Sequence, residues 1–193
     1  GWSHVGRSFD GAHYSWNGKA SNVTVVGATP TRGVFQVDGW GWNRVAFAYG
    51  AYSHGFAAAK SASEFRVFSV FYGDFRDVLK TDNRPLALRQ ADTDHINIAS
   101  FGGHFIHAAE TSGGTLDLLA WGVGQTGSWG RTDHRAGAVL FEAGFQPKGV
   151  PALKPWLRAG YSRTTGDDDP SDGTHNTFFQ LMPTPRPYAK MPF

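Results

Sequence analysis

The clearest pattern in the chain is a two-residue alternation between positions 64 and 76. One parity carries the apolar residues Phe65, Val67, Phe71 and Phe75, and the other carries the charged residues Glu64, Arg66, Asp74 and Arg76. Successive side chains of a β-strand point to opposite faces, so this pattern predicts a strand with one apolar and one charged side.

The same alternation, interrupted by clusters of Gly, Pro, Asn and Asp, predicts about eight strands along the chain. We expect them at residues 8–16, 22–28, 44–53, 64–76, 95–108, 115–127, 139–145 and 157–162. The connections tend to alternate in length. Those at 17–18, 55–63, 112–114 and 146–155 are short, those at 29–43 and 77–94 are long, and 128–134 is intermediate.

Alternating connection lengths are typical of up-and-down barrels in bacterial outer membranes, which have tight turns on one rim and long loops on the other. The strand at 64–76 also has the length of roughly 9–11 residues that a tilted strand needs to cross a bilayer. We therefore expect an all-β fold, an antiparallel transmembrane β-barrel of which this chain supplies about eight strands. Residues 1–193 are expected to be one domain, with a long polar and proline-rich loop region at 166–193.

Composition agrees with strands rather than helices. The 193 residues include 25 Gly, 15 Phe, 7 Trp and 6 Tyr but only 2 Met, and aromatic residues favour strands and membrane interfaces. Cysteine is absent, so disulfides and thiolate metal sites are excluded. The formal net charge of +2 and the lack of a basic cluster argue against nucleic acid as a partner.

Parity assigns the side chains of such a barrel to lipid or to water. Lipid-facing positions are expected at Phe65, Val67, Phe71, Phe75, Val139, Phe141 and Phe145. The lumen and solute path are expected at Arg44, Arg66, Arg76, Arg158, Glu64, Asp74, Asp117 and Glu142. The lumen faces also carry Ala46, Ala48, Gly50 and Gly160, which are small and leave space for water. Lumen arginines bind carboxylates or phosphates well, so the expected solute is anionic.

Other site types have weaker support. The strand charges alone would also fit the exposed face of a sheet in a water-soluble protein. His104 and His107 lie three apart and so on opposite faces of a strand, which argues against a shared metal. An acidic run at 167–169 has some likeness to a calcium loop, but Pro170 and the missing twelfth ligand break the EF-hand pattern. No catalytic motif is present, so we expect neither an enzyme nor a cofactor.

Residues 166–184 read GDDDPSDGTHNTFFQLMPT. This stretch resembles the signature region of the alginate export family of bacterial outer-membrane barrels. The signature positions are Asp168, Asp169, Gly173, Thr174, Phe178, Gln180 and Pro183. The runs SFDG at 8–11 and PTRGVF at 30–35, with Asp38-Gly39, are similar to upstream segments of the same family, so the likeness extends over most of the chain.

The resemblance implies a channel for alginate or a related anionic polysaccharide in the outer membrane of a Gram-negative bacterium. The family barrel has roughly eighteen strands, so we expect the chain to be a part of a longer barrel. Two alternatives stay open: a general or nutrient porin for small molecules, and a water-soluble carbohydrate-binding β-protein that stacks sugars on Trp40, Trp42, Trp121 and Trp129. An enzyme acting on polysaccharide is a further, weaker alternative.

Overall fold

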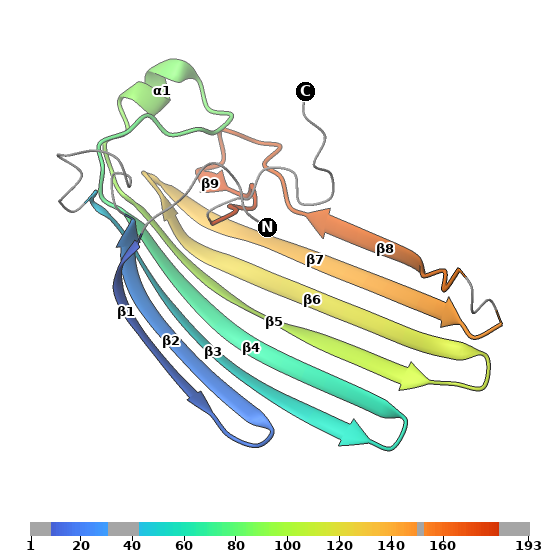
Figure 1. The fold of residues 1–193 in the computed structure, drawn as a ribbon. Helices are drawn as coiled ribbons and strands as arrows, with labels where there is room; N and C mark the ends of the chain where they lie inside the picture. Colours follow the sequence, from blue (N-terminus) through green and yellow to red (C-terminus); the bar gives the residue numbers. More distant parts are fainter. Residues whose placement is uncertain (1–8, 31–42, 150–152, 182–193) are drawn as a thin grey trace.

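The computed structural model describes residues 9–30, 43–149 and 153–181. Eight long strands follow one another in an antiparallel meander, in the spatial order β1 to β8, and a short ninth strand pairs in parallel with β7 (Figure 1). The strands are β1 (Phe9–Asn17), β2 (Ser21–Pro30), β3 (Val45–Ala58), β4 (Ser61–Asp74), β5 (Ile96–Glu110), β6 (Gly114–Trp129), β7 (Thr132–Pro147), β8 (Leu157–Thr164) and β9 (Thr174–His175). The expectation of an all-β, antiparallel, up-and-down fold is confirmed.

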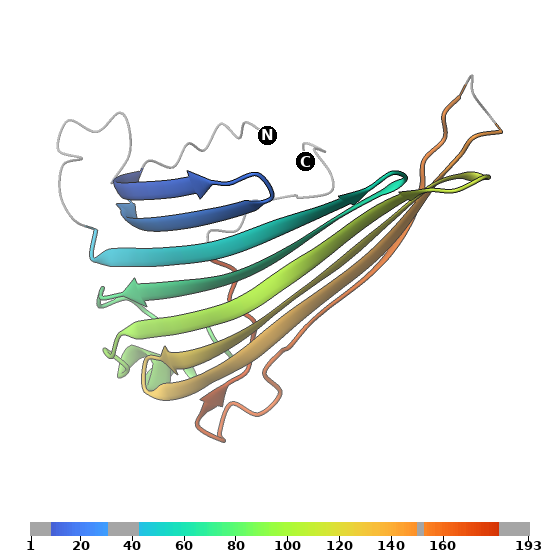
Figure 2. The same ribbon diagram turned by 90° about the horizontal axis from the view of Figure 1, so that it is seen from below.

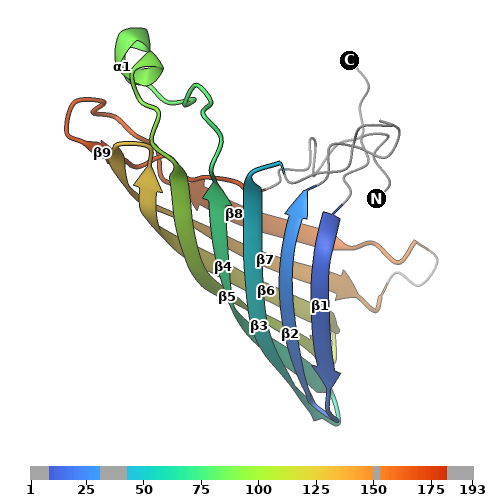
Figure 3. The ribbon, with the colours of Figure 1, turned by 90° about the vertical axis from the view of Figure 1, so that its left-hand side faces the viewer.

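The sheet is strongly curved and open. In Figure 2 the strands fan out side by side from β1 to β8, and in Figure 3 the later strands lie behind the earlier ones, so the sheet forms a trough. Among the described residues, β1 pairs only with β2 and β8 only with β7, so no hydrogen-bonded ladder joins the two edges.

Helix is almost absent. The helix α1 (Leu86–Gln90) has five residues and lies in the connection between β4 and β5. No helix among the described residues is long and apolar enough to cross a membrane.

The two rims of the sheet differ, although less regularly than the sequence predicts. Residues 18–20, 59–60 and 111–113 make tight connections on one rim, and 31–44 and 75–95 make long ones on the other. One expectation was wrong: residues 128–134 were expected as a connection of intermediate length, but only Gly130 and Arg131 lie between β6 and β7, on the rim with the long connections. On the opposite rim β7 ends at Pro147 and β8 begins at Leu157, close to the expected connection at 146–155.

The tight turn at Gly130 has a local explanation. Gly130 has a φ of 62°, which favours glycine, and an added Cβ there would overlap the Asp92 carboxylate. The segment 56–60, which the sequence left as a connection, instead extends β3 to Ala58 and leaves only residues 59 and 60 for the turn.

Candidate functional site

The register of the ladder fixes which side chains share a face, because directly paired residues of neighbouring strands point the same way. One continuous face carries Trp16, Val23, Tyr52, Val67, Gly103, Gly122 and Val139 across successive strands, and we call it the apolar face. The opposite face carries Arg66, His104, Trp121, Leu140 and Ser162, and we call it the polar face.

The apolar face is exposed. Phe71, Phe141 and Val67 each leave at least half of their surface open, and the Phe71 ring packs edge-on against Phe101 at 5.9 Å. The large apolar side chains exposed on this face are Tyr14, Trp16, Val25, Tyr52, Phe56, Val67, Phe71, Phe101, Phe105, Leu118, Val139, Phe141, Leu157 and Tyr161. Exposed apolar surface this extensive marks a contact with lipid or with another protein.

Charge is nearly absent from the apolar face. Within the described strands it is confined to Asp10, Asp133, Arg135 and Arg163, all close to strand ends on the rim of the long connections. From β2 to β6 this face carries no Asp, Glu, Lys or Arg. The face therefore includes a broad band without charge.

Burial is reversed relative to an ordinary water-soluble sheet. The buried apolar residues of the described chain all lie on the polar face: Val45, Ile96, Ile98, Trp129 and Ala138. The largest fully buried side chains are polar ones, Lys80, His134 and Ser100. Water-soluble proteins usually bury apolar side chains and leave polar ones exposed, so the apolar face is adapted to a non-aqueous neighbour.

Two ionic clusters lie on the polar face within the strands. In the first, Glu64 contacts the His104 imidazole at 3.1 Å and the Arg66 guanidinium at 3.8 Å. The Nε atom of Arg66 is buried without a hydrogen-bond partner. Arg66 is therefore only loosely compensated by its acidic neighbour.

The second cluster is centred on Arg158 and lies toward the opposite rim. Its guanidinium donates to Asp117 and, at 2.7 Å, to Glu142, and it lies over the Trp156 ring at 4.2 Å. The Trp156 indole N–H also donates to Asp117 at 3.0 Å. Two carboxylates thus face one guanidinium, and the cluster has an excess of negative charge.

The structure places most of the predicted lumen residues on one face. Arg66, Arg158, Glu64, Asp74, Asp117 and Glu142 all lie on the polar face. Arg76 lies beyond the end of β4, where it makes a bidentate pair with Asp74 at 2.8 and 2.6 Å. Of the predicted lipid-facing residues, Phe65, Val67, Phe71, Val139, Phe141 and Phe145 lie on the apolar face, and Phe75 lies just past β4, against the His95 ring.

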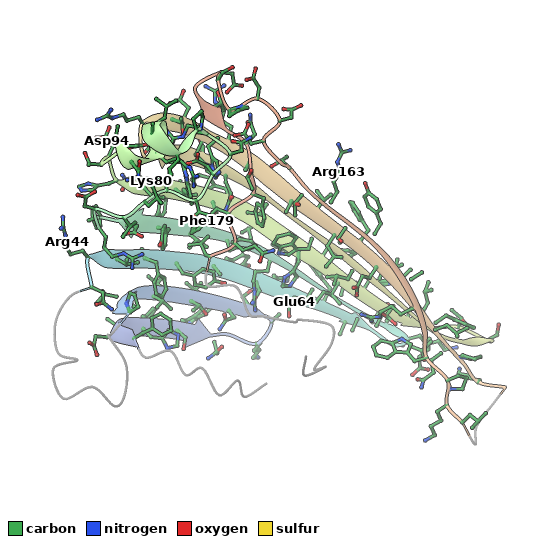
Figure 4. The ribbon with its side chains drawn as sticks, turned by 90° about the horizontal axis from the view of Figure 1, so that it is seen from above. Arg44, Glu64, Lys80, Asp94, Arg163 and Phe179 are labelled. Carbon is green, nitrogen blue, oxygen red and sulfur yellow. The ribbon has the colours of Figure 1, made fainter. Side chains whose placement is uncertain are left out.

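The parity assignment of the third strand was wrong. Arg44 precedes β3 and adopts a φ of 58°, and Figure 4 shows it at the rim. Ala46, Ala48 and Gly50 lie on the apolar face, paired with Gly73, Phe71 and Ser69. The physical reason is that neither parity of β3 carries charge, and Tyr49 belongs to an aromatic contact on the polar face, with Phe68 at 6.4 Å.

The connection 75–95 is held to the sheet by a buried ionic network. Arg84 donates to Asp82 at 2.9 Å and to Asp92 at 2.9 Å, and the Lys80 ammonium donates to the Asp92 carbonyl at 2.9 Å. The indole N–H of Trp129, on β6, donates to Asp82 at 3.0 Å. This network fixes the loop over one end of the polar face.

Hydrogen bonds determine the charge state of this network. Burial by itself raises the pKa of the Asp92 carboxyl, but hydrogen bonds from the Arg131 amide, the Arg84 guanidinium and the Asp94 amide outweigh burial and lower it. At Asp82, burial is likewise outweighed by hydrogen bonds from Arg84 and Trp129, so that pKa is also lowered. Both carboxyls are therefore ionised at neutral pH.

The described part of the signature region, residues 166–181, docks on the sheet, whereas the sequence predicted a loop region there. Gly173 has a φ of 80°, Thr174 and His175 form β9, and Phe178 donates its amide to the Thr165 carbonyl at 3.1 Å. Asp169 accepts hydrogen bonds from Ser171, whereas Asp168 and Gln180 are exposed. Pro183 lies outside the described residues.

Several side chains that hold this segment were not predicted. They are Gln125, His134, His175 and Phe179. The only signal in the sequence was the signature motif, which contains His175 and Phe179 but says nothing of their partners on β6 and β7.

No group of three His, Asp or Glu side chains in the described part of the chain is arranged to hold a metal ion. Of the tryptophans considered for sugar stacking, Trp129 is buried and Trp121 is half-buried on the polar face, and Trp40 and Trp42 lie outside the described residues. Comparisons with protein-family models, with curated proteins and with solved structures found no match. The resemblance to the alginate export family therefore stays a prediction.

Proposed function

We propose that this chain forms part of the wall of an outer-membrane β-barrel channel in a Gram-negative bacterium. The observation that carries the proposal is the broad band without charge on the apolar face, directly opposite a face with ionic clusters in its strands. A wall between hydrocarbon and water requires this division. The channel acts passively and makes or breaks no covalent bond.

The open edges fit an arc of a larger barrel. Hydrocarbon offers no partner for the unpaired backbone groups along β1 and β8, so a membrane wall needs further strands to close it. Those strands complete the barrel in this proposal.

The solute we propose is an anionic polysaccharide of the alginate type, or a smaller related anion. The support is the signature motif at 166–184 and the guanidinium of Arg66, which is weakly compensated by Glu64. A planar donor fork of this kind suits carboxylate groups.

A second candidate is a general or nutrient porin for small polar molecules. Arg158 favours it, because Asp117 and Glu142 already neutralise that guanidinium. A path lined by guanidinium groups whose charge is offset by carboxylates attracts anions less than a path lined by free arginines.

Planar-bilayer recordings of the full-length protein test the proposal. We expect stable channels whose reversal potential in a salt gradient indicates a preference for anions, and a reduced preference in Arg66→Ala and Arg158→Ala. Arg163→Ala is the matched control, since it removes the same charge from the apolar face. Absence of channels rejects the channel proposal, and channels whose ion preference is unchanged in Arg66→Ala reject the anionic solute in favour of the porin.

A further inference from the structure

The segment Thr174–Leu181 crosses the polar face just inside the rim of the long connections. We call it the strap. It begins as β9, which pairs in parallel with the first residues of β7 through Asp133 and His134. Because β7 starts at the rim of the long connections, a segment parallel to it enters the trough from that rim. Figure 4 shows Phe179 over the sheet, inside the rim where Arg44 lies.

The side chain of Gln125, on β6, hydrogen-bonds to the backbone of the strap. Its side-chain amide donates to the Phe179 carbonyl at 2.9 Å and accepts from the Phe179 amide at 2.9 Å. The same side chain donates to Ser100 at 3.1 Å, and only 6% of Gln125 is exposed. One side chain thus satisfies both backbone groups of a residue that has no strand partner, as a β-bridge would.

Aromatic packing anchors the strap at the same point. The Phe179 ring lies 5.1 Å from Tyr72 on β4 and 5.4 Å from Trp129 on β6, next to buried Ile96 and Ile98. His175 stacks on Trp129 at 4.5 Å and contacts His134 at 2.9 Å. The strap therefore spans from β7 across to β4.

We infer that the strap is the constriction of the proposed channel and sets its size limit, with Gln125 as the positioning residue that holds it. This inference rests on the proposed function, because only in a channel does the polar face border the path of the solute. The strap contains no Asp, Glu, Lys or Arg, and the side chains that it leaves exposed, Thr177 and Gln180, are neutral. It should therefore limit size without setting ion preference, which we assign to Arg66.

Single-channel recordings of the full-length protein test the inference with two variants that release the strap. We expect Gln125→Ala and Phe179→Ala to raise the conductance and to shift the size limit for neutral polyethylene glycols toward larger polymers, with ion preference unchanged. Gln146→Ala is the matched control, because it removes the same side chain from the polar face near the other rim, where Gln146 makes only a 3.4 Å hydrogen bond to the Lys154 carbonyl.

A second measurement does not depend on loosening the fold. The protein has no cysteine, so Thr177→Cys provides a single thiol on the exposed side of the strap. A bulky thiol reagent should block most of the current through Thr177→Cys channels and leave the unmodified sequence unaffected.

The outcomes separate the two proposals. If no variant and no wild-type protein forms channels, the proposed function is rejected together with this inference. If channels form but neither release of the strap nor labelling at position 177 alters their current, the constriction is rejected and the channel proposal stands.

Discussion

The two faces of this sheet are built from the same strands and differ in what covers them. The apolar face has no covering segment among the described residues, and large side chains such as Phe71 and Phe141 are half exposed on it. The polar face is covered near one rim by the connection 75–95 and by the strap, which bury Lys80 and His134 completely or nearly so.

This difference shows how one backbone can present two kinds of surface. The backbone hydrogen bonds are satisfied within the ladder for both faces alike, so the alternating side chains alone decide which medium each face tolerates. Ionic groups are stable on the polar face because partners of opposite charge or loop backbone reach them there.

The largest expected effect comes from removing Asp92, whose ion pairs with Lys80 and Arg84 hold the connection 75–95 over the polar face. Asp92→Ala would leave Lys80 and Arg84 without their shared carboxylate, and breaking a buried ion pair of this kind costs about 3–5 kcal/mol. Hydrogen exchange should show the connection 75–95 opening, with faster exchange at Ile96 and Ile98. The comparison variant is Arg135→Ala, whose pair with Asp133 at 3.9 Å is mostly exposed, and it should change exchange very little.

A slightly smaller effect is expected from placing a charge on the apolar face. Phe141→Arg should destabilise the membrane-inserted protein by about 2–4 kcal/mol if this position lies at the depth of the hydrocarbon. Ser162→Arg places the same side chain on the polar face of the neighbouring strand and should be tolerated. Unfolding by urea from lipid bilayers measures both, and equal destabilisation of the two variants would contradict the assignment of the faces.

The smallest effect is a local release of the strap by acid. Burial lowers the pKa of His175; nearby Asp82 opposes this shift and Arg84 adds to it, while His134 contacts the ring directly. A histidine whose pKa is lowered by folding stabilises the docked state above its unfolded pKa of about 6.5, and this contribution is lost as the pH falls through the lower folded value.

A spin label attached to Thr177→Cys should therefore gain mobility as the medium is acidified below that unfolded value. Burial also lowers the pKa of His134, to about 4, so the same label should lose most of this pH dependence only in a protein that carries both His134→Gln and His175→Gln. A label whose mobility rises equally in both proteins would show that another group releases the strap.

The sequence predicted strand β4 correctly because its charges all fall on one parity, which leaves one reasonable orientation. Strand β3 has no charge on either parity, so the position of Phe47 and Tyr49 on the polar face was decided by aromatic neighbours, such as Phe9 at 5.6 Å from Phe47. The tight turn at Gly130 escaped prediction for a related reason, since the Asp92 carboxylate that crowds it comes from a distant connection.

The amino-acid sequence by itself determined the class of fold, the two-sided character of the strands and most of the residues on each face, because a period of two is a local property of the chain. Only the tertiary structure decided which groups meet across the polar face: Arg158 with two carboxylates, Trp129 with Asp82, and Gln125 with the backbone of Phe179. These contacts join residues far apart in the sequence, and their geometry depends on register and curvature, which no local pattern specifies.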